Sequence, residues 1–97
     1  MSKGYWICCY RSVSNPAALT EYAAAAGPAI KDAGGRFLTR GIPAKAYEAG
    51  KNERTVVIEF DSVEQAIAAY ESEAYKTALK RLSGSAERDV RIMEGAV

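Results

Sequence analysis

The chain has 97 residues, 48% of them hydrophobic, and its 13 basic and 12 acidic side chains leave a formal net charge of +1 at pH 7. This length predicts one domain over residues 1–97, which buries roughly 60–65% of its unfolded surface on folding. The charges nearly balance and the sequence contains no basic stripe, which argues against nucleic-acid binding. No apolar run approaches the ~20 residues that span a bilayer. The first apolar stretch is too short for a signal peptide, so we expect a cytoplasmic protein without membrane attachment.

The composition also restricts the chemistry of any site. The chain contains no histidine, which removes the usual general base at neutral pH and the commonest metal and haem ligand. Its two cysteines, Cys8 and Cys9, are adjacent in a predicted strand, so their side chains point to opposite faces. That arrangement suits neither a disulfide nor a shared metal ion. We therefore expect no metal and no cofactor.

The N-terminal segment predicts a strand followed by a long helix. Aromatic and β-favouring residues on both alternations of residues 4–11 indicate a strand that is covered on both faces. Asn15 and Pro16 form a helix start, with an N-cap asparagine and a proline at the first helical position. One apolar stripe continues in phase past Pro28, which predicts a kinked helix rather than two helices. Gly34-Gly35 is the expected left-handed cap. The stripe consists of Leu19, Tyr22, Ala23, Ala26, Ile30 and Ala33.

The second strand is expected over residues 36–48, with an interruption at Gly41. Pro43 lies inside this segment and cannot donate to a strand ladder, so it predicts an edge strand. Residues 50–52 are the expected turn of a hairpin. They lead into an apolar third strand over residues 55–60.

The third strand runs almost without a loop into two short helices. Asp61 or Ser62 caps the first, because each is followed three residues later by Glu or Gln in a capping-box pattern. Ser72 caps the second. The buried stripes are expected to contain Val63, Ala66, Ile67 and Tyr70, then Tyr75, Ala78, Leu79 and Leu82. Residues 90–94 are the expected last strand.

The resulting order, β-α-β-β-α-β, is the ferredoxin-like plan of an α+β domain. It predicts a four-stranded antiparallel sheet with helices on one face and with the first and third strands in the middle. Alternation places Val56, Ile58 and Phe60 under the helices, and Thr55, Val57 and Glu59 on the open face. The open face is mixed apolar and aromatic, so we expect a second copy to pack on it sheet to sheet in a homodimer.

Several segments resemble the domain of unknown function 1330 family, over nearly the whole chain. They are residues 4–7 (GYWI), 25–29 (AAGPA), 34–41 (GGRFLTRG), 57–60 (VIEF), 69–75 (AYESEAY) and 94–95 (EG). The resemblance implies a ferredoxin-like protomer that forms a dimeric α/β barrel. The superfamily of such barrels includes cofactor-free monooxygenases, haem-degrading enzymes, chlorite-dismutase relatives and muconolactone-isomerase-like proteins. The missing histidine departs from the haem-degrading branch, and the family itself implies no established activity.

The candidate site centres on Arg40 and Glu59. Even spacing puts Arg36 and Arg40 on one face of their strand, and the predicted hairpin brings Arg40 within a diagonal step of Glu59. One hypothesis is that Arg40 binds a carboxylate or enolate of a ligand, with Glu59 as a general base whose pKa burial raises. The other is that these charges form a structural ion pair.

Three further residues are candidate ligand contacts: Trp6, Tyr75 and Arg81. Trp6 belongs to a group of aromatic residues that either lines a pocket or simply packs. Tyr75 begins the apolar stripe of its short helix, which favours a core position. Arg81 lies off that stripe, free to reach the following loop or a ligand.

Two classes of function remain for a homodimer with these residues. The first is a small-molecule-binding protein without turnover. The alternative is a cofactor-independent enzyme, monooxygenase-like or isomerase-like, that acts on a small acidic or aromatic compound. An open, unpaired cavity beside the candidate residues would separate a binding site from a closed ion pair.

Overall fold

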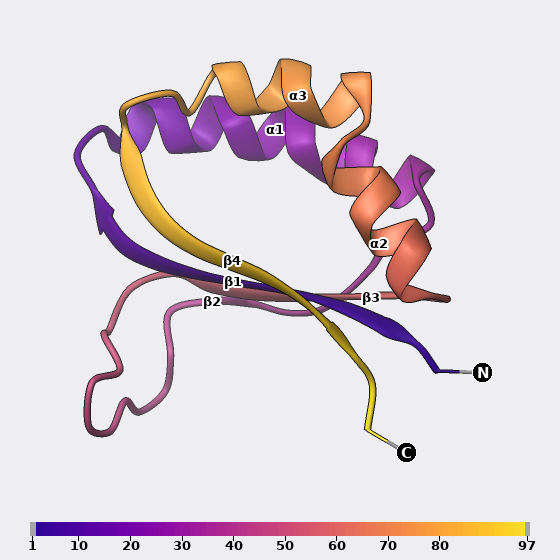
Figure 1. Ribbon diagram of the computed structural model, residues 1–97. Helices are drawn as coiled ribbons and strands as arrows, with labels where there is room; N and C mark the ends of the chain where they lie inside the picture. Colours follow the sequence, from indigo (N-terminus) through magenta and orange to yellow (C-terminus); the bar gives the residue numbers. More distant parts are fainter. Residues whose placement is uncertain (1, 97) are drawn as a thin grey trace.

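The computed structural model describes residues 2–96, which form the elements β-α-β-β-α-α-β. They are β1 (Gly4–Val13), α1 (Pro16–Asp32), β2 (Arg36–Gly41), β3 (Thr55–Phe60), α2 (Val63–Tyr70), α3 (Glu73–Lys80) and β4 (Ala86–Glu94). The strands make one antiparallel sheet in the order β2-β3-β1-β4, and the helices cover one of its faces (Figure 1). This is the predicted ferredoxin-like α+β fold, with the first and third strands in the middle.

The helices begin at predicted caps. The side chains of Asn15, Ser62 and Ser72 each accept a hydrogen bond from a backbone N–H three residues on, at 3.3, 3.1 and 3.2 Å. The capping box is not completed at Ser62, because the side chain of Gln65 donates instead to the carbonyl of Ala33 at 3.1 Å. That bond ties the start of α2 to the end of α1.

Helix α1 continues past Pro28 as one helix, as predicted, and ends at a glycine cap. Gly34 has a φ of 97°, in the left-handed region. Its N–H donates to the carbonyl of Lys31 at 3.0 Å, and that of Gly35 donates to the carbonyl of Ile30 at 2.9 Å. These bonds satisfy carbonyls that the helix end leaves without partners.

The core lies between the helices and the sheet. Trp6, Ile58, Phe60 and Tyr75 are its most deeply buried large side chains. The rings of Trp6 and Tyr75 meet edge to face, with centroids 4.9 Å apart. In β3, Val56, Ile58 and Phe60 are buried under the helices, as predicted, while the intervening residues are only partly covered on the open face.

The strand β2 is shorter than predicted. It ends at Gly41, and residues 42–54 form an irregular connection instead of a resumed strand and a tight hairpin. Pro43, which has no N–H for a ladder, lies in this connection. The connection extends away from the sheet on the side opposite the helices (Figure 1). It exposes Ile42 and Tyr47 to solvent.

A bulge in β2 changes which face its arginines occupy. Leu38 is left unpaired, so Arg36 pairs with Glu59 whereas Arg40 pairs with Val56. An extra residue reverses the alternation of the side chains that follow it. The prediction that both arginines share one face is therefore wrong: Arg36 lies on the open face and Arg40 on the face under the helices.

The outer strand β4 is longer than predicted, because it begins at Ala86. The extension pairs Arg88 with Tyr10 of β1. Tyr10 is buried under the helices, so Arg88 shares that face. The longer strand thus brings a guanidinium group to the covered side of the sheet.

The remaining predictions about composition concern cysteines and membranes. Cys8 is buried and Cys9 is exposed, on opposite faces as predicted, and both are free thiols. Across residues 2–96, the helices lack the combined length and hydrophobicity needed to cross a membrane. The same residues include no group of three or more His, Cys, Asp or Glu placed to hold a metal ion.

Candidate functional site

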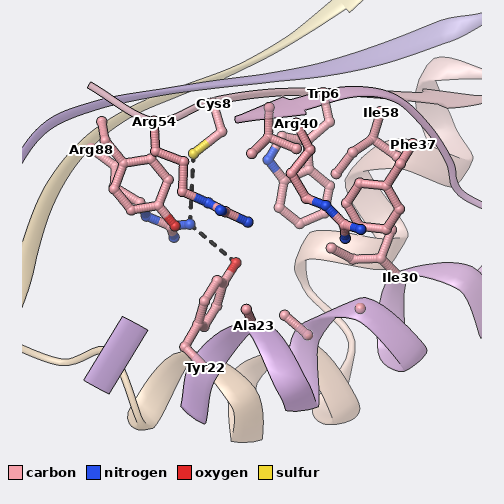
Figure 2. A pocket seen from close by; sticks show the side chains of 14 residues that line it. Trp6, Cys8, Tyr22, Ala23, Ile30, Phe37, Arg40, Arg54, Ile58 and Arg88 are labelled. Carbon is pink, nitrogen blue, oxygen red and sulfur yellow. Dashed lines mark hydrogen bonds between the residues drawn. The ribbon is translucent and has the colours of Figure 1, made fainter. Parts of the chain in front are cut away.

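A cavity lies between the covered face of the sheet and α1 (Figure 2). Its volume is about 30 Å³, a small space bordered by the side chains of Arg40, Arg54 and Arg88. Its wall is mostly apolar and aromatic, and α1 contributes small residues that leave the space open. The larger wall residues are Trp6, Tyr10, Tyr22, Ile30, Phe37, Val56 and Ile58.

Arginine side chains reach this cavity from three different segments. Arg40 comes from β2 beyond the bulge, Arg54 from the residue before β3, and Arg88 from β4. Figure 2 shows Arg40 and Arg54 extending into the space above α1, with Arg88 toward one end. None of the described residues that line the cavity is acidic. Within residues 2–96, the three guanidinium groups also take part in no ion pair.

The guanidinium group of Arg88 is held by uncharged partners. Its Nη1 donates to the hydroxyl oxygen of Tyr22 at 3.1 Å and contacts the sulfur of Cys8 at 3.7 Å. Its Nη2 donates to the hydroxyl oxygen of Tyr75 at 3.2 Å. The Arg88 Cζ also lies 5.6 and 5.3 Å from the ring centroids of Tyr10 and Tyr22, within cation–π range. No carboxylate among the described residues neutralises this charge.

Burial sets the protonation states of these partners. Burial raises the pKa of the Cys8 thiol and of the Tyr22 and Tyr75 phenols. Burial by itself lowers the pKa of Arg88, but the adjacent Tyr22 and Tyr75 raise it above its ordinary value. At neutral pH the cluster is therefore one cation surrounded by neutral, hydrogen-bonding side chains.

The other two arginines are incompletely satisfied or exposed. The Nε of Arg54 is buried and has no hydrogen-bond partner among residues 2–96. A buried donor without an acceptor costs about 1–3 kcal/mol. Arg40 is exposed, and its Cζ lies 4.5 Å from the ring centroid of Phe37.

The structure separates the predicted pair Arg40 and Glu59. Arg40 lines the cavity, whereas Glu59 lies on the open face and accepts from the Nε of Arg36 at 3.0 Å. The Tyr5 hydroxyl donates to its second oxygen at 2.9 Å. The predicted Arg40–Glu59 contact is wrong because the bulge at Leu38 turns Arg40 to the other face and leaves Arg36 opposite Glu59.

The electrostatics of Glu59 also differ from the prediction. The hydrogen bond from Tyr5, followed by that from Arg36, lowers the pKa of Glu59. Arg36 likewise lowers the pKa of Asp61, which accepts from its Nη2 at 3.1 Å. A carboxylate with a lowered pKa and two bound donors is a weak base, so the expected rise in the pKa of Glu59 is corrected.

The other predicted residues fall in different places. Trp6 lines the cavity from β1. Tyr75 is buried in the core and reaches the site only through its bonds to Arg88 and Tyr22. Arg81 is exposed at the C-terminal end of α3 and does not line the cavity.

Sequence reasoning missed Arg54 and Arg88 as site residues, although both left a signal. Arg54 continues the apolar alternation of Val56 and Ile58 backwards by one step. Arg88 in the same way precedes Val90 on the covered alternation of β4. A charge on the buried alternation of a strand indicates either a partner or a ligand.

Solved structures share this fold. The chain is similar to a protein of unknown function from Rhodopseudomonas palustris, with TM-score 0.73, 13% identity, and coverage of 99% of this chain and 84% of that one. It is similar to a dimeric ferredoxin-like protein of unknown function from Thermobifida fusca, with TM-score 0.66, 15% identity, and coverage of 96% and 91%. SnoaB, a cofactor-independent oxygenase from Streptomyces nogalater, has TM-score 0.64, 11% identity, and coverage of 100% and 96%. These identities show the fold alone.

No curated protein sequence matches the chain. A family described as a domain of unknown function (DUF1330) matches residues 3–96. The matched residues include every helix and every strand of the described structure, from β1 to β4. The chain therefore belongs to the DUF1330 family.

Proposed function

We propose that the protein binds a small organic anion with an apolar or aromatic body in the cavity beneath the sheet. The observation that carries this proposal is the set of three arginines, Arg40, Arg54 and Arg88, in a cavity without an acidic lining residue. Like charges gathered in this way repel each other unless an anion lies between them. The aromatic and aliphatic wall supports a ligand that is apolar apart from its charged group.

A carboxylate suits the donors better than a spherical anion does. A guanidinium group presents parallel N–H donors that match the two oxygens of a carboxylate. Arg54 also lines the cavity, and its Nε is a buried donor without a partner among residues 2–96. The apolar part of the ligand would lie against Trp6 and Phe37, which belong to the same wall.

The test compares benzoate with benzamide, which has a similar shape but no charge. We expect benzoate to bind in isothermal titration calorimetry and to raise the melting temperature, and benzamide to do neither. Arg54→Met should weaken benzoate binding by about tenfold or more, because a hydrogen bond to a charged group contributes ~1.5–3 kcal/mol.

The matched control is Arg91→Met. Arg91 lies on β4 like Arg88, but it is exposed on the open face and contacts Asp89 at 3.0 Å. Its loss should leave benzoate affinity unchanged. If wild type binds neither benzoate nor related aromatic carboxylates, or if both variants weaken binding equally, the cavity is not an anion site.

We further propose that the functional unit is a homodimer built through the open face of the sheet. Ile7 and Val57 pair in the centre of that face, and Met93 is more than half exposed on it. The similar fold from Thermobifida fusca is described as dimeric, which supports this assembly.

A cofactor-independent oxygenase or isomerase is the second candidate. It is favoured by the protonated Tyr22 and Cys8 groups, which line the same cavity as the arginines. The fold it shares with SnoaB adds support. Oxygen consumption or product formation with a bound aromatic acid or enol, lost in Arg88→Met, would distinguish this candidate from binding without turnover.

A further inference from the structure

The hydroxyl groups of Tyr22 and Tyr75 share one hydrogen bond beside the cavity. Their oxygens lie 2.6 Å apart, and distance alone leaves either one as the donor. Arg88 has no acceptor atom, so its two bonds run from nitrogen to each phenol oxygen, at 3.1 Å to Tyr22 and 3.2 Å to Tyr75. Each phenol has a single proton, and only one of the two protons is used between the rings.

Burial decides which proton is left over. Suppose that Tyr22 donated to Tyr75. The proton of Tyr75 would then need an acceptor, but the described residues give its hydroxyl no further partner than Tyr22 and Arg88. Tyr75 is 1% exposed and does not line the cavity. This arrangement leaves a buried donor unsatisfied, which is costly.

The opposite arrangement leaves no unsatisfied donor on Tyr75. Tyr75 donates to Tyr22, whose oxygen also accepts from Arg88. The remaining proton then belongs to Tyr22, which lines the cavity. In Figure 2 the Tyr22 hydroxyl points up from α1 toward the space that Arg54 enters.

We infer that Tyr22 donates its hydroxyl proton to an acceptor-only oxygen of the ligand, and that Tyr75 and Arg88 hold Tyr22 in this orientation. The inference rests on the proposed anion site and adds a selection rule to it. An oxygen that accepts from the Tyr22 O–H also has the guanidinium groups of the same cavity wall around it, so a carboxylate or enolate oxygen is favoured there. An amide or amine nitrogen would place a donor against these donors.

The test compares three variants, each of which removes the hydroxyl group of one tyrosine: Tyr22, Tyr75 or Tyr70. Tyr22→Phe removes the proposed donor and should weaken benzoate binding by roughly tenfold or more. Tyr75→Phe removes the supporting bond but keeps the Tyr22 proton, so the loss should stay within about threefold. Tyr70→Phe is the control, because the Tyr70 ring packs 5.1 Å from that of Tyr75 and lies outside the cavity lining. It should bind like wild type.

Equal affinity of Tyr22→Phe and wild type would overturn the inference while leaving the anion site intact. So would a loss in Tyr75→Phe as large as that in Tyr22→Phe. Failure of wild type itself to bind aromatic carboxylates would instead overturn the proposed function and, with it, the ligand contact.

A ligand-free measurement tests the proton arrangement separately. In ring-labelled protein, hydroxyl protons can be assigned by nuclear magnetic resonance through their couplings to the ring carbons. We expect the Tyr75 hydroxyl proton to exchange slowly with water and that of Tyr22 to exchange rapidly. A protected proton on Tyr22 and an exchanging one on Tyr75 would reverse the arrangement, whatever the cavity binds.

Discussion

Individual arginines in this protein have different roles because of their partners. On the open face, Arg36 contacts Glu59 at 3.0 Å and Asp61 at 3.1 Å. Under the helices, Arg88 contacts phenol oxygens and a thiol at 3.1–3.7 Å. The first guanidinium group is neutralised, whereas the second has no acidic partner among residues 2–96.

Because of the Tyr5–Glu59 hydrogen bond, the free energy of unfolding should decrease as the pH falls into the acid range. Glu59 has a lowered pKa in the folded protein, against about 4.3 when unfolded. Its contribution is therefore present above that unfolded value and is lost as the pH falls through the folded pKa. We expect Tyr5→Phe to raise the pKa of Glu59 and to reduce the loss of unfolding free energy between neutral pH and acid. Carboxyl-carbon titration and urea unfolding measure the two effects.

Tyr47→Phe is the control for this change, because Tyr47 is exposed in the connection after β2. It should leave the titration of Glu59 unaltered. An unchanged Glu59 midpoint in Tyr5→Phe would show that Arg36 alone sets the pKa.

Arg40, like Trp6, was predicted as a ligand contact from the sequence and lines the cavity. Arg40→Met keeps an aliphatic side chain but removes the guanidinium group, whose Cζ lies 4.5 Å from the ring centroid of Phe37. We expect nearly unchanged stability in urea and a tenfold to hundredfold loss of benzoate affinity, equivalent to ~1.5–3 kcal/mol. Arg36→Met, on the open face, should leave that affinity unchanged. Wild-type affinity in a folded Arg40→Met variant would make Arg40 a structural residue.

At the scale of elements, short irregularities position the site. The bulge at Leu38 turns Arg40 into the cavity, and the early start of β4 places Arg88 there. The glycine cap of α1 directs the chain into β2, since Gly34 adopts a φ of 97°. These features lie at element boundaries, where backbone geometry changes most within a few residues.

The cap of α1 can be tested by separating backbone strain from side-chain crowding. A Cβ at Gly34 would meet the side chain of Gln65. Alanine and asparagine both have a Cβ, so both variants share this contact. Gly34→Ala adds the cost of a left-handed alanine, roughly 1–2 kcal/mol. Gly34→Asn should be less destabilising in urea, because asparagine tolerates that conformation. Equal losses in the two variants would show that crowding, and not φ, makes glycine necessary.

At the scale of the whole molecule, the sheet separates a covered site from an uncovered face. The helices lie on one side, and the connection after β2 extends on the other (Figure 1). Ile7 and Val57 occupy the middle of the uncovered face, where they are only partly shielded. An apolar patch at the centre of a sheet favours burial against a second sheet.

We expect sedimentation equilibrium at low micromolar concentration to show twice the chain mass. Ile7→Lys places a charge at the centre of the proposed interface and should shift the protein to monomer. Ile67→Lys is the matched control. The sequence predicted Ile67 to be buried, but it is 40% exposed on α2, away from the open face. A monodisperse wild-type monomer would contradict the assembly, as would equal dissociation of both variants.

Signals that act over a few residues were sufficient to predict the elements and their order from the sequence. Asn15 and Ser72 cap helices because their side chains reach backbone N–H groups three residues away. The alternation of apolar residues in β3 predicted which face of the strand is buried. Helix caps and strand alternation are both predictable because each depends on residues close together in the chain. The absence of histidine and the separation of Cys8 from Cys9 were likewise read from the sequence directly.

The cavity and the partners of its charges were decided only by the tertiary structure. Whether Arg36 or Arg40 meets Glu59 depends on a one-residue bulge, which exchanges the two faces of the strand without a strong local signal. Arg88 enters the cavity through pairing of β4 with β1, which are far apart in the sequence. Strand register is set by packing across the whole sheet. The sequence by itself therefore determined the order of the helices and strands, whereas the tertiary structure decided which side chains line the cavity.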